Sequence, residues 1–299
     1  MTAAESSAKG IAVFLLIAFG IAWGTWIPLL PSAADGHMVR FELYALPGAF
    51  APALATFVVR KWITREGFAD VGLALRSRQW RYYLVAWLLP LPVLAFIVLA
   101  APALGFPQAD FSAQQSLSSL APGVPHRIGS AAAYLLPLQC LIAAPFLAPI
   151  LFGEEFGWRG YLQLRLFAQR PTLAAIVTGI IWGLWHLPII LRGYEFPGDP
   201  LIATTVFCIG TIMFSIIFGW LHRRSGSIWV NSLAHSATNV IGGSLTALWF
   251  PASVRLYVGY AGLLSWIPLG LLCVWIILCG RRSFRTATAA GNLLPGTTA

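Results

Sequence analysis

The sequence predicts an all-α, polytopic membrane protein with about eight transmembrane helices. Three observations lead to this fold class: 58% of the 299 residues are hydrophobic, only 10% are charged, and the mean hydropathy is +0.77. A soluble globular chain carries about 25% charged residues, so this chain has too few polar groups to cover a surface exposed to water. A soluble enzyme, a disordered chain and a disulfide-stapled secreted domain are therefore excluded, and lipid is expected to touch the apolar surface.

Eight apolar stretches have roughly the 20 residues that a helix needs to cross a hydrocarbon core. They lie near residues 10–30, 42–60, 82–103, 131–153, 172–192, 200–221, 228–249 and 256–279. The first stretch could be a signal peptide, because Ser32-Ala33-Ala34 resembles a cleavage site, but its long apolar run favours a retained span. The second stretch contains Pro47 and Pro52, and membrane helices tolerate proline.

The basic residues predict how these helices are oriented. With eight spans, fifteen Lys and Arg residues fall on one side of the membrane and four on the other. The positive-inside rule then places both termini in the cytoplasm of a multi-pass protein of the cell membrane. Residues 1–285 are expected to form a single transmembrane domain with a motif-bearing core at 131–249, and residues 286–299 a short disordered cytoplasmic tail.

The net charge of +9 could suggest a nucleic-acid partner, but the chain has no long run of basic residues that would support one. Membrane lipids are the expected surroundings, and the oligomeric state is left open.

Ionisable and amide side chains inside the predicted spans are few, and their cost in a membrane makes them candidates for function. The candidates lie on three predicted helices and are Glu154, Glu155, Arg159, His186, His235 and Asn239. Glu155 and Arg159 are four residues apart, in the order that favours an ion pair, and the same spacing places His235 and Asn239 on one helix face.

The depth of these residues in the membrane also matches. If a helical hairpin turns near Pro171, Glu154 lies about 25 Å and His186 about 22 Å from the turn, at 1.5 Å per residue. His235 lies about 12 Å from the next short basic loop, a level that agrees if the hairpin projects beyond the membrane. Three helices could therefore present Glu154, His186 and His235 to one polar pocket in the cytoplasmic half.

Such a pocket supports two chemistries, which the residues leave open. A carboxylate and an imidazole can hold a water molecule and take its proton without any metal. Alternatively, Glu154, His186 and His235 could ligate Zn²⁺ and leave a fourth position for water, although the H-E-x-x-H spacing is absent. Either route activates water for hydrolysis, and His235 or Asn239 could then stabilise an oxyanion. The cofactor is therefore either Zn²⁺ or none, with equal weight.

The three segments resemble the motifs of the CPBP intramembrane proteases, a family that includes CAAX prenyl endopeptidases of the Rce1 type and bacterial Abi proteins. The family pattern is E-E-x-x-x-R, then an aromatic residue four positions before His, then H-x-x-x-N. In this chain it reads Glu154-Glu155-x-x-x-Arg159, Trp182-x-x-x-His186 and His235-x-x-x-Asn239. The family usually has Phe where this chain has Trp182.

The resemblance implies proteolysis inside the membrane, on a protein or peptide substrate that is not necessarily prenylated. It implies that Glu154 activates water and that His186 helps to hold it. Glu155 and Arg159 would support and orient these groups, and His235 and Asn239 would bind the scissile carbonyl or its oxyanion.

Two other classes of function fit the composition. One is a non-enzymatic membrane protein of the immunity or scaffold type, as in bacteriocin self-immunity. The other is a proton-coupled transporter that uses the membrane-embedded Glu and His as a relay, although the sequence shows no repeated halves. The leading prediction is an intramembrane endopeptidase.

Overall fold

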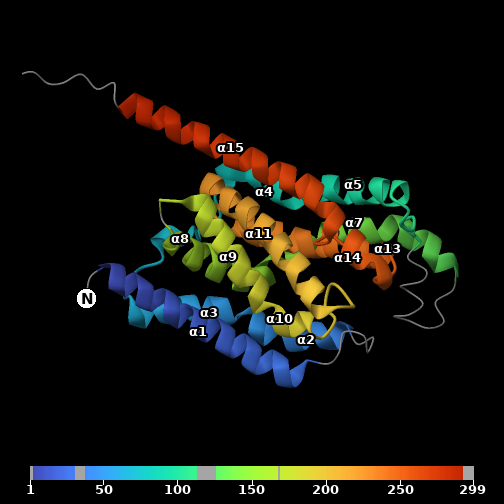
Figure 1. Ribbon diagram of the computed structural model, residues 1–299, viewed down its shortest axis with the longest axis horizontal. Helices are drawn as coiled ribbons and strands as arrows, with labels where there is room; N and C mark the ends of the chain where they lie inside the picture. The colour runs from blue at the N-terminus through green and yellow to red at the C-terminus, as the bar shows by residue number, and fades with distance from the viewer. Residues whose placement is uncertain (1–2, 31–37, 113–125, 168, 292–299) are drawn as a thin grey trace, which may run out of the picture.

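The computed structural model describes residues 3–30, 38–112, 126–167 and 169–291, and these ranges contain helices and loops but no strand (Figure 1). The α-helices are α1 (Ala3–Leu29), α2 (Met38–Ala49), α3 (Ala51–Val58), α4 (Trp80–Leu88), α5 (Pro90–Ala103), α7 (His126–Gly157), α8 (Gln163–Arg165), α9 (Pro171–Trp185), α10 (Leu187–Ile190), α11 (Pro200–Ser225), α12 (Ile228–Ala237), α13 (Ser244–Trp249), α14 (Arg255–Val258) and α15 (Trp266–Gly291). Short 3₁₀ turns are η3 (Ala69–Val71), η4 (Ser77–Gln79), η7 (Ala252–Val254) and η8 (Leu263–Ser265).

Six helical stretches within the described residues are long and apolar enough to cross a membrane, which confirms the all-α, polytopic class. They are Ser7–Leu29, Leu43–Ile63, Ser77–Ala103, Leu135–Arg165, Pro200–Ser225 and Ala252–Cys279. Each of the six coincides with one of the eight predicted spans. Two predicted spans have no such stretch, so the count of eight is not confirmed.

The other two predicted spans are helical but differ from a simple membrane helix. The span expected at 172–192 is α9, which has only 15 residues and ends just before His186. The span expected at 228–249 is divided among α12, a π-helical segment and α13.

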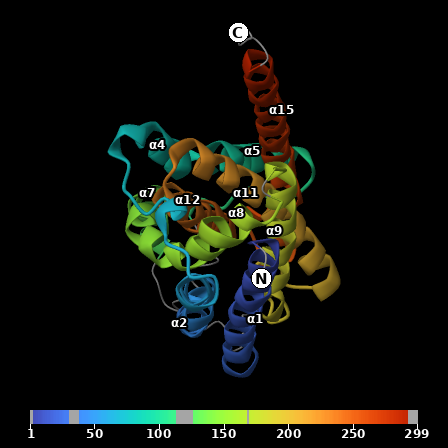
Figure 2. The same cartoon turned by 90° about the vertical axis from the view of Figure 1, so that its left-hand side faces the viewer.

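The ends of the chain lie only partly within the described residues. Helix α15 continues to Gly291, so the first six residues of the predicted tail are helical, while 292–299 lie outside the described residues. The helix extends beyond the rest of the bundle in both views (Figures 1 and 2). The Ser32-Ala33-Ala34 segment also lies outside the described residues.

Helix α9 packs mainly along α11, and glycines allow this close approach. A Cβ atom on Gly179 would lie 2.5 Å from the Cα atom of Ile212, and one on Gly183 would lie 2.7 Å from the Sγ atom of Cys208. These two glycines are four residues apart and share a face of α9, the arrangement by which membrane helices often pack closely. The result fixes α9, and with it His186, against α11.

The boundaries of α9 and α11 follow from their sequences. Pro171 occupies the first turn of α9, where its missing N–H is not needed. Asp199 caps α11 by accepting hydrogen bonds from the backbone N–H groups of Leu201 and Ile202. Gly226 ends α11 at a φ of 63°, in the left-handed region that glycine adopts without strain.

Helix α12 packs mainly along α7, and α3 packs against the same long helix. At Gly157, the last residue of α7, a Cβ atom would lie 2.3 Å from the Cβ atom of Pro52. Helices α7, α9 and α12 carry the three predicted motifs, so these contacts determine how the motifs face one another.

Three described segments are π-helical: η2 (Val59–Ile63), η5 (Trp158–Leu162) and η6 (Thr238–Gly243). Single π-helical turns are rare in proteins and occur frequently at functional sites. Segment η5 contains Arg159 and η6 contains Asn239, so two of the three predicted motifs end in such a turn.

Candidate active site

Glu154 lies near the end of α7 and is only 6% exposed. Its Oε2 atom accepts a hydrogen bond of 2.7 Å from the indole Nε1–H of Trp182, on α9. This bond joins the first motif to the second. It fixes the Oε2 atom of the carboxylate and leaves Oε1 available for another partner.

This role of Trp182 was not predicted from the sequence, in which the residue stands only as an aromatic substitution for Phe. A Phe side chain has no hydrogen-bond donor, whereas a buried indole N–H usually finds an acceptor. That general rule was the available signal, but it did not identify the acceptor.

Glu155 is fully buried and is the acceptor for two other motif residues. Its Oε1 atom lies 2.7 Å from Nη1 of Arg159 and 3.0 Å from Nδ1 of His235. The ion pair predicted from the four-residue spacing of Glu155 and Arg159 is therefore confirmed. The two neighbouring carboxylates have different partners, because successive residues point to different sides of α7.

The Arg159 guanidinium is buried between aromatic rings. It lies 4.3 Å from the ring centroid of Trp182 and 5.0 Å from that of Phe218. Cation–π attraction is strongest where the cation is desolvated, so these rings help to hold the charge that the ion pair with Glu155 balances.

His186 directly follows α9 and is 8% exposed. Its backbone N–H bonds to the carbonyl of Gly183, so the carbonyl of Trp182 lacks the usual helical donor. The Nδ1 atom of His186 lies 2.8 Å from that carbonyl oxygen. A carbonyl oxygen can only accept, so Nδ1 carries the proton, and in the neutral ring Nε2 has the free lone pair.

The indole of Trp182 is the common neighbour of these groups. Its ring centroid lies 5.8 Å from that of His186 and 5.1 Å from that of His235, both in edge-to-face contact. Together with the bond to Glu154 and the stacked Arg159, these contacts gather residues from α7, η5, α9 and α12 around one side chain.

Asn239 is placed differently from the other five predicted residues. It lies in η6 and is exposed, and within the described structure no hydrogen bond joins its amide to the cluster. A π-helical turn has more residues per turn than an α-helix, so the four-residue spacing from His235 no longer ensures a shared face.

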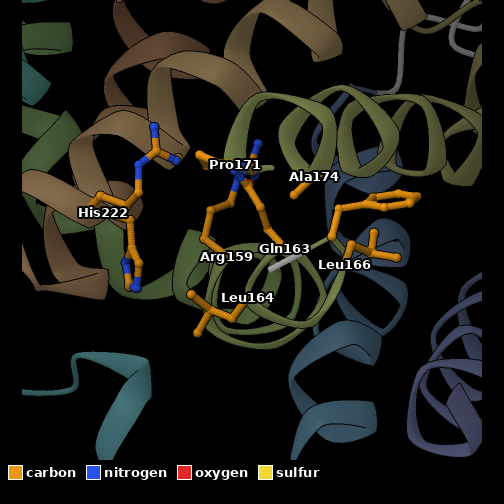
Figure 3. Close-up of a pocket in the computed structure, with 10 residues that line it drawn as sticks. Arg159, Gln163, Leu164, Leu166, Pro171, Ala174 and His222 are labelled. Carbon is orange, nitrogen blue, oxygen red and sulfur yellow. The ribbon is translucent and has the colours of Figure 1, made fainter. Parts of the chain in front are cut away.

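A cavity of about 110 Å³ lies next to the cluster, at the end of the bundle where α8, α9 and α11 meet (Figure 3). Of the six predicted site residues, Arg159 is the one that lines it. The predicted shared pocket of Glu154, His186 and His235 is therefore not this cavity.

The zinc hypothesis requires three protein ligands around one point. Among the described side chains, no group of three or more His, Cys, Asp or Glu residues is arranged to hold a metal ion. As these side chains lie, Glu154, His186 and His235 do not fit a zinc site, and no step below uses a metal.

The motif-bearing segment of the chain is similar to known proteins. Residues 133–241 match the family described as "Type II CAAX prenyl endopeptidase Rce1-like". The CAAX prenyl protease 2 of Methanococcus maripaludis is 30% identical over 192 residues, which cover 60% of this chain and 64% of that protein. The chain thus spans somewhat less than two thirds of this relative. The matched segment contains all six predicted site residues. The segment that carries the three motifs is therefore similar to the Rce1-like family of CAAX prenyl endopeptidases, the family that the motifs resemble.

Proposed function

We propose that this chain is an intramembrane endopeptidase that hydrolyses a peptide bond of a protein or peptide substrate delivered at the membrane. The observation that carries the proposal is the cluster around Trp182, in which Glu154 and His186 are each held by a hydrogen bond to the same residue. A buried carboxylate beside a histidine with a free Nε2 is the arrangement that general-base catalysis needs.

In the proposed reaction, Glu154 takes a proton from a water molecule that also donates a hydrogen bond to Nε2 of His186. The water oxygen attacks the scissile carbonyl carbon, and the carbonyl oxygen becomes an oxyanion. The proton that Glu154 accepted then passes to the leaving amine as the C–N bond breaks. The Trp182 bond keeps the carboxylate oriented throughout these steps.

His235 is proposed to stabilise the oxyanion. When protonated, its ring keeps the bond from Nδ1 to Glu155 and presents an Nε2–H donor to the developing charge. Arg159 contacts the same Oε1 atom of Glu155, so one carboxylate orients both side chains. Asn239 is proposed as a second donor to the carbonyl, reached by the substrate from the exposed side of η6.

Replacement of Glu154 by Gln tests the proposal, because it keeps the shape and removes the base. We expect purified protein in lipid to cleave a membrane-delivered peptide, and we expect the E154Q variant to be slower by about 10²–10⁴-fold. The matched control is D199N, the same chemical change at an exposed helix cap where Asn serves equally well. Full activity in E154Q would exclude Glu154 as the base, whereas no cleavage by the wild type would favour a non-enzymatic membrane protein.

The substrate class needs a direct comparison. Since the relative from M. maripaludis is named for prenyl-protein cleavage, a prenylated CAAX peptide should be assayed beside its unmodified form. Preference for the prenylated peptide would extend that name to this chain, and equal rates would indicate a broader membrane-delivered substrate.

We also infer that the chain lies in the cell membrane with both termini in the cytoplasm. Several contacts place basic segments at one end of the bundle: Arg60 donates to the Gly160 carbonyl, and Arg165 pairs with Asp70. The backbone N–H of Ile228, beside the Arg223–Arg224 pair, bonds to the carbonyl of Gly72 in the same loop region. This grouping supports a single positively charged end, which the positive-inside rule assigns to the cytoplasm.

A further inference from the structure

The cavity beside Arg159 has a lining that is basic and polar on one side and apolar on the other. Its ten lining residues are Arg159, Gln163, Leu164, Leu166, Phe167, Pro171, Ala174, Gly219, His222 and Arg223. The set contains two arginines and a histidine and no acidic residue. Figure 3 shows the side chains of Arg159 and Gln163 between His222 on one side and Ala174 on the other.

Arg159 brings unused donors to this lining. One guanidinium nitrogen, Nη1, bonds to Glu155, but in the described structure Nε and Nη2 have no hydrogen-bond partner. The side chain is only 1% exposed. Leaving buried donors of a charged group unpaired is costly, so a ligand that accepts from this guanidinium would be stabilised.

Gln163 adds a second donor to the same wall. Its Oε1 atom accepts a hydrogen bond of 3.4 Å from the hydroxyl of Ser215, which leaves the amide nitrogen on the other side. That nitrogen lies against Gly219, where an added Cβ atom would be only 2.1 Å away. The absence of a side chain at Gly219 therefore makes room for the amide donor at the cavity.

Two further features are positive at the opening. Arg223 lines the cavity and is exposed, so it lies at the mouth rather than in the interior. Pro171 and Ala174 belong to the first turn of α9, a 15-residue helix whose N-terminus carries a partial positive charge.

We propose that this cavity binds a phosphate group, supplied either by a phospholipid headgroup or by free phosphate. Donors from Arg159, Gln163, Arg223 and the start of α9 are more than the two oxygens of a carboxylate would use, whereas a phosphate offers three or four. Glu154, His186 and His235 do not line the cavity, so the site lies beside the proposed catalytic cluster. Phosphate and cluster would meet at Arg159, which contacts both.

Direct binding measurements test this without any peptide substrate, so the result is independent of the proposed hydrolysis. The full chain is purified in a neutral detergent, and binding of labelled inorganic phosphate is measured by equilibrium dialysis. Binding of a short-chain phosphatidic acid is measured in parallel by native mass spectrometry. Saturable binding of either probe supports the site, and the probe that binds identifies the source of the phosphate group.

Two single-charge variants make the test specific. R223Q removes a lining arginine at the mouth, and we expect it to weaken phosphate binding about tenfold, the loss typical of one charge-assisted hydrogen bond. R224Q removes the neighbouring exposed arginine, which does not line the cavity, and we expect affinity within about twofold of the wild type. G219A keeps the charge but displaces the Gln163 amide, and it should also weaken binding.

The proposal is overturned if neither probe binds saturably, or if R224Q weakens binding as much as R223Q does, since that would indicate general surface charge. It is also overturned if an N-acetylated amino acid with a free carboxylate binds more tightly than either phosphate probe. Binding of carboxylate would instead assign the cavity to a peptide terminus.

Discussion

At the scale of single residues, Trp182 is the side chain that connects most of the candidate site. It donates to Glu154 through its indole and accepts from His186 through its carbonyl, and its ring contacts Arg159 and His235. The family resemblance identified this position only as aromatic. The structure gives the larger residue a polar function that Phe cannot supply.

Replacing Trp182 by Phe should therefore lower activity while keeping the aromatic contacts. The change leaves Glu154 without its donor, and we expect kcat for peptide cleavage to fall about tenfold, the effect of losing one hydrogen bond to a charged group. KM should change little, since the ring itself remains. Steady-state kinetics on purified protein measure both quantities.

Trp185 provides the matched control for this variant. It is a buried Trp on the same helix, and its indole donates to the carbonyl of Ala18, away from the carboxylates. W185F should reduce thermal stability without a selective loss of kcat. An equal loss of kcat in both variants would indicate that Trp182 acts only through packing.

The contacts of the candidate site differ in whether a sequence pattern can predict them. The Glu155–Arg159 pair was predictable, because it depends only on positions within one helical turn. The bonds from Trp182 to Glu154 and from His235 to Glu155 join different helices, and their geometry depends on how α9 and α12 pack on α7. No local pattern encodes that packing.

At the scale of helices, length and apolar composition predicted the six stretches that can cross a membrane. The π-helical segments were not predicted, because a π-helical turn leaves no compositional signal and depends on surrounding contacts. Segment η5 has such a contact: Arg60, which is fully buried, donates to the carbonyl of Gly160 at 2.9 Å. The turn that carries Arg159 is thus held by a residue 100 positions earlier in the chain.

The packing of α9 on α11 leads to a prediction about stability. Gly179→Ala adds a Cβ atom 2.5 Å from the backbone of α11, so the helices must separate. We expect a loss of about 1–3 kcal/mol in the free energy of unfolding, as for other overpacked sites. Reversible unfolding in mixed detergent micelles measures it.

Gly20→Ala is the control for this change. Gly20 also lies in an apolar helix, α1, but an added Cβ atom there meets no atom within 4 Å. Its stability should match that of the wild type. A similar loss in both variants would mean that the helix backbone, rather than the α9–α11 contact, is sensitive to alanine.

The loop after η2 gives a prediction of pH dependence. Burial raises the pKa of Asp70, but hydrogen bonds and attraction to Arg60 and Arg165 outweigh it and hold the pKa below its usual value of 3.8. A lowered folded-state pKa means that these pairs stabilise the fold above the unfolded-state pKa, and that the stabilisation is lost as the pH falls through the lowered value. Asp70 is half-exposed, so the effect at pH 7 should be at most about 1 kcal/mol.

Thermal unfolding of the wild type and D70N across pH 7 to 3 measures this effect. The wild type should unfold at the higher temperature at pH 7, and the difference should shrink as Asp70 becomes protonated. A difference that is constant over this range would show that the carboxylate charge does not contribute.

At the scale of the whole molecule, contacts divide the bundle into two ends. Near one end, Gly10 of α1 approaches Tyr161 and Thr64, beside the cluster of Arg60, Asp70 and Arg165. At the other end of α1, the carbonyl of Ile27 accepts a hydrogen bond from Arg192, which follows α10. The residues predicted on opposite sides of the membrane therefore lie at opposite ends of one helix. Which end faces the cytoplasm stays a prediction, and it rests on charge alone.

This division leads to a prediction of membrane orientation that single cysteines can test. After replacement of the four native cysteines, Arg78→Cys and Pro197→Cys place exposed thiols at the two ends. With cytoplasmic termini, a membrane-impermeant maleimide should label the cysteine at position 197 in intact cells, and the one at position 78 only after the cells are permeabilised. The opposite pattern would reverse the orientation and put the basic end, the cavity beside Arg159 and its phosphate supply outside the cytoplasm. Position 78 lies in the short 3₁₀ turn η4 and position 197 in a loop, and neither belongs to the candidate site. Cleavage activity should therefore persist in both variants, so that labelling reports on the orientation of a functional fold.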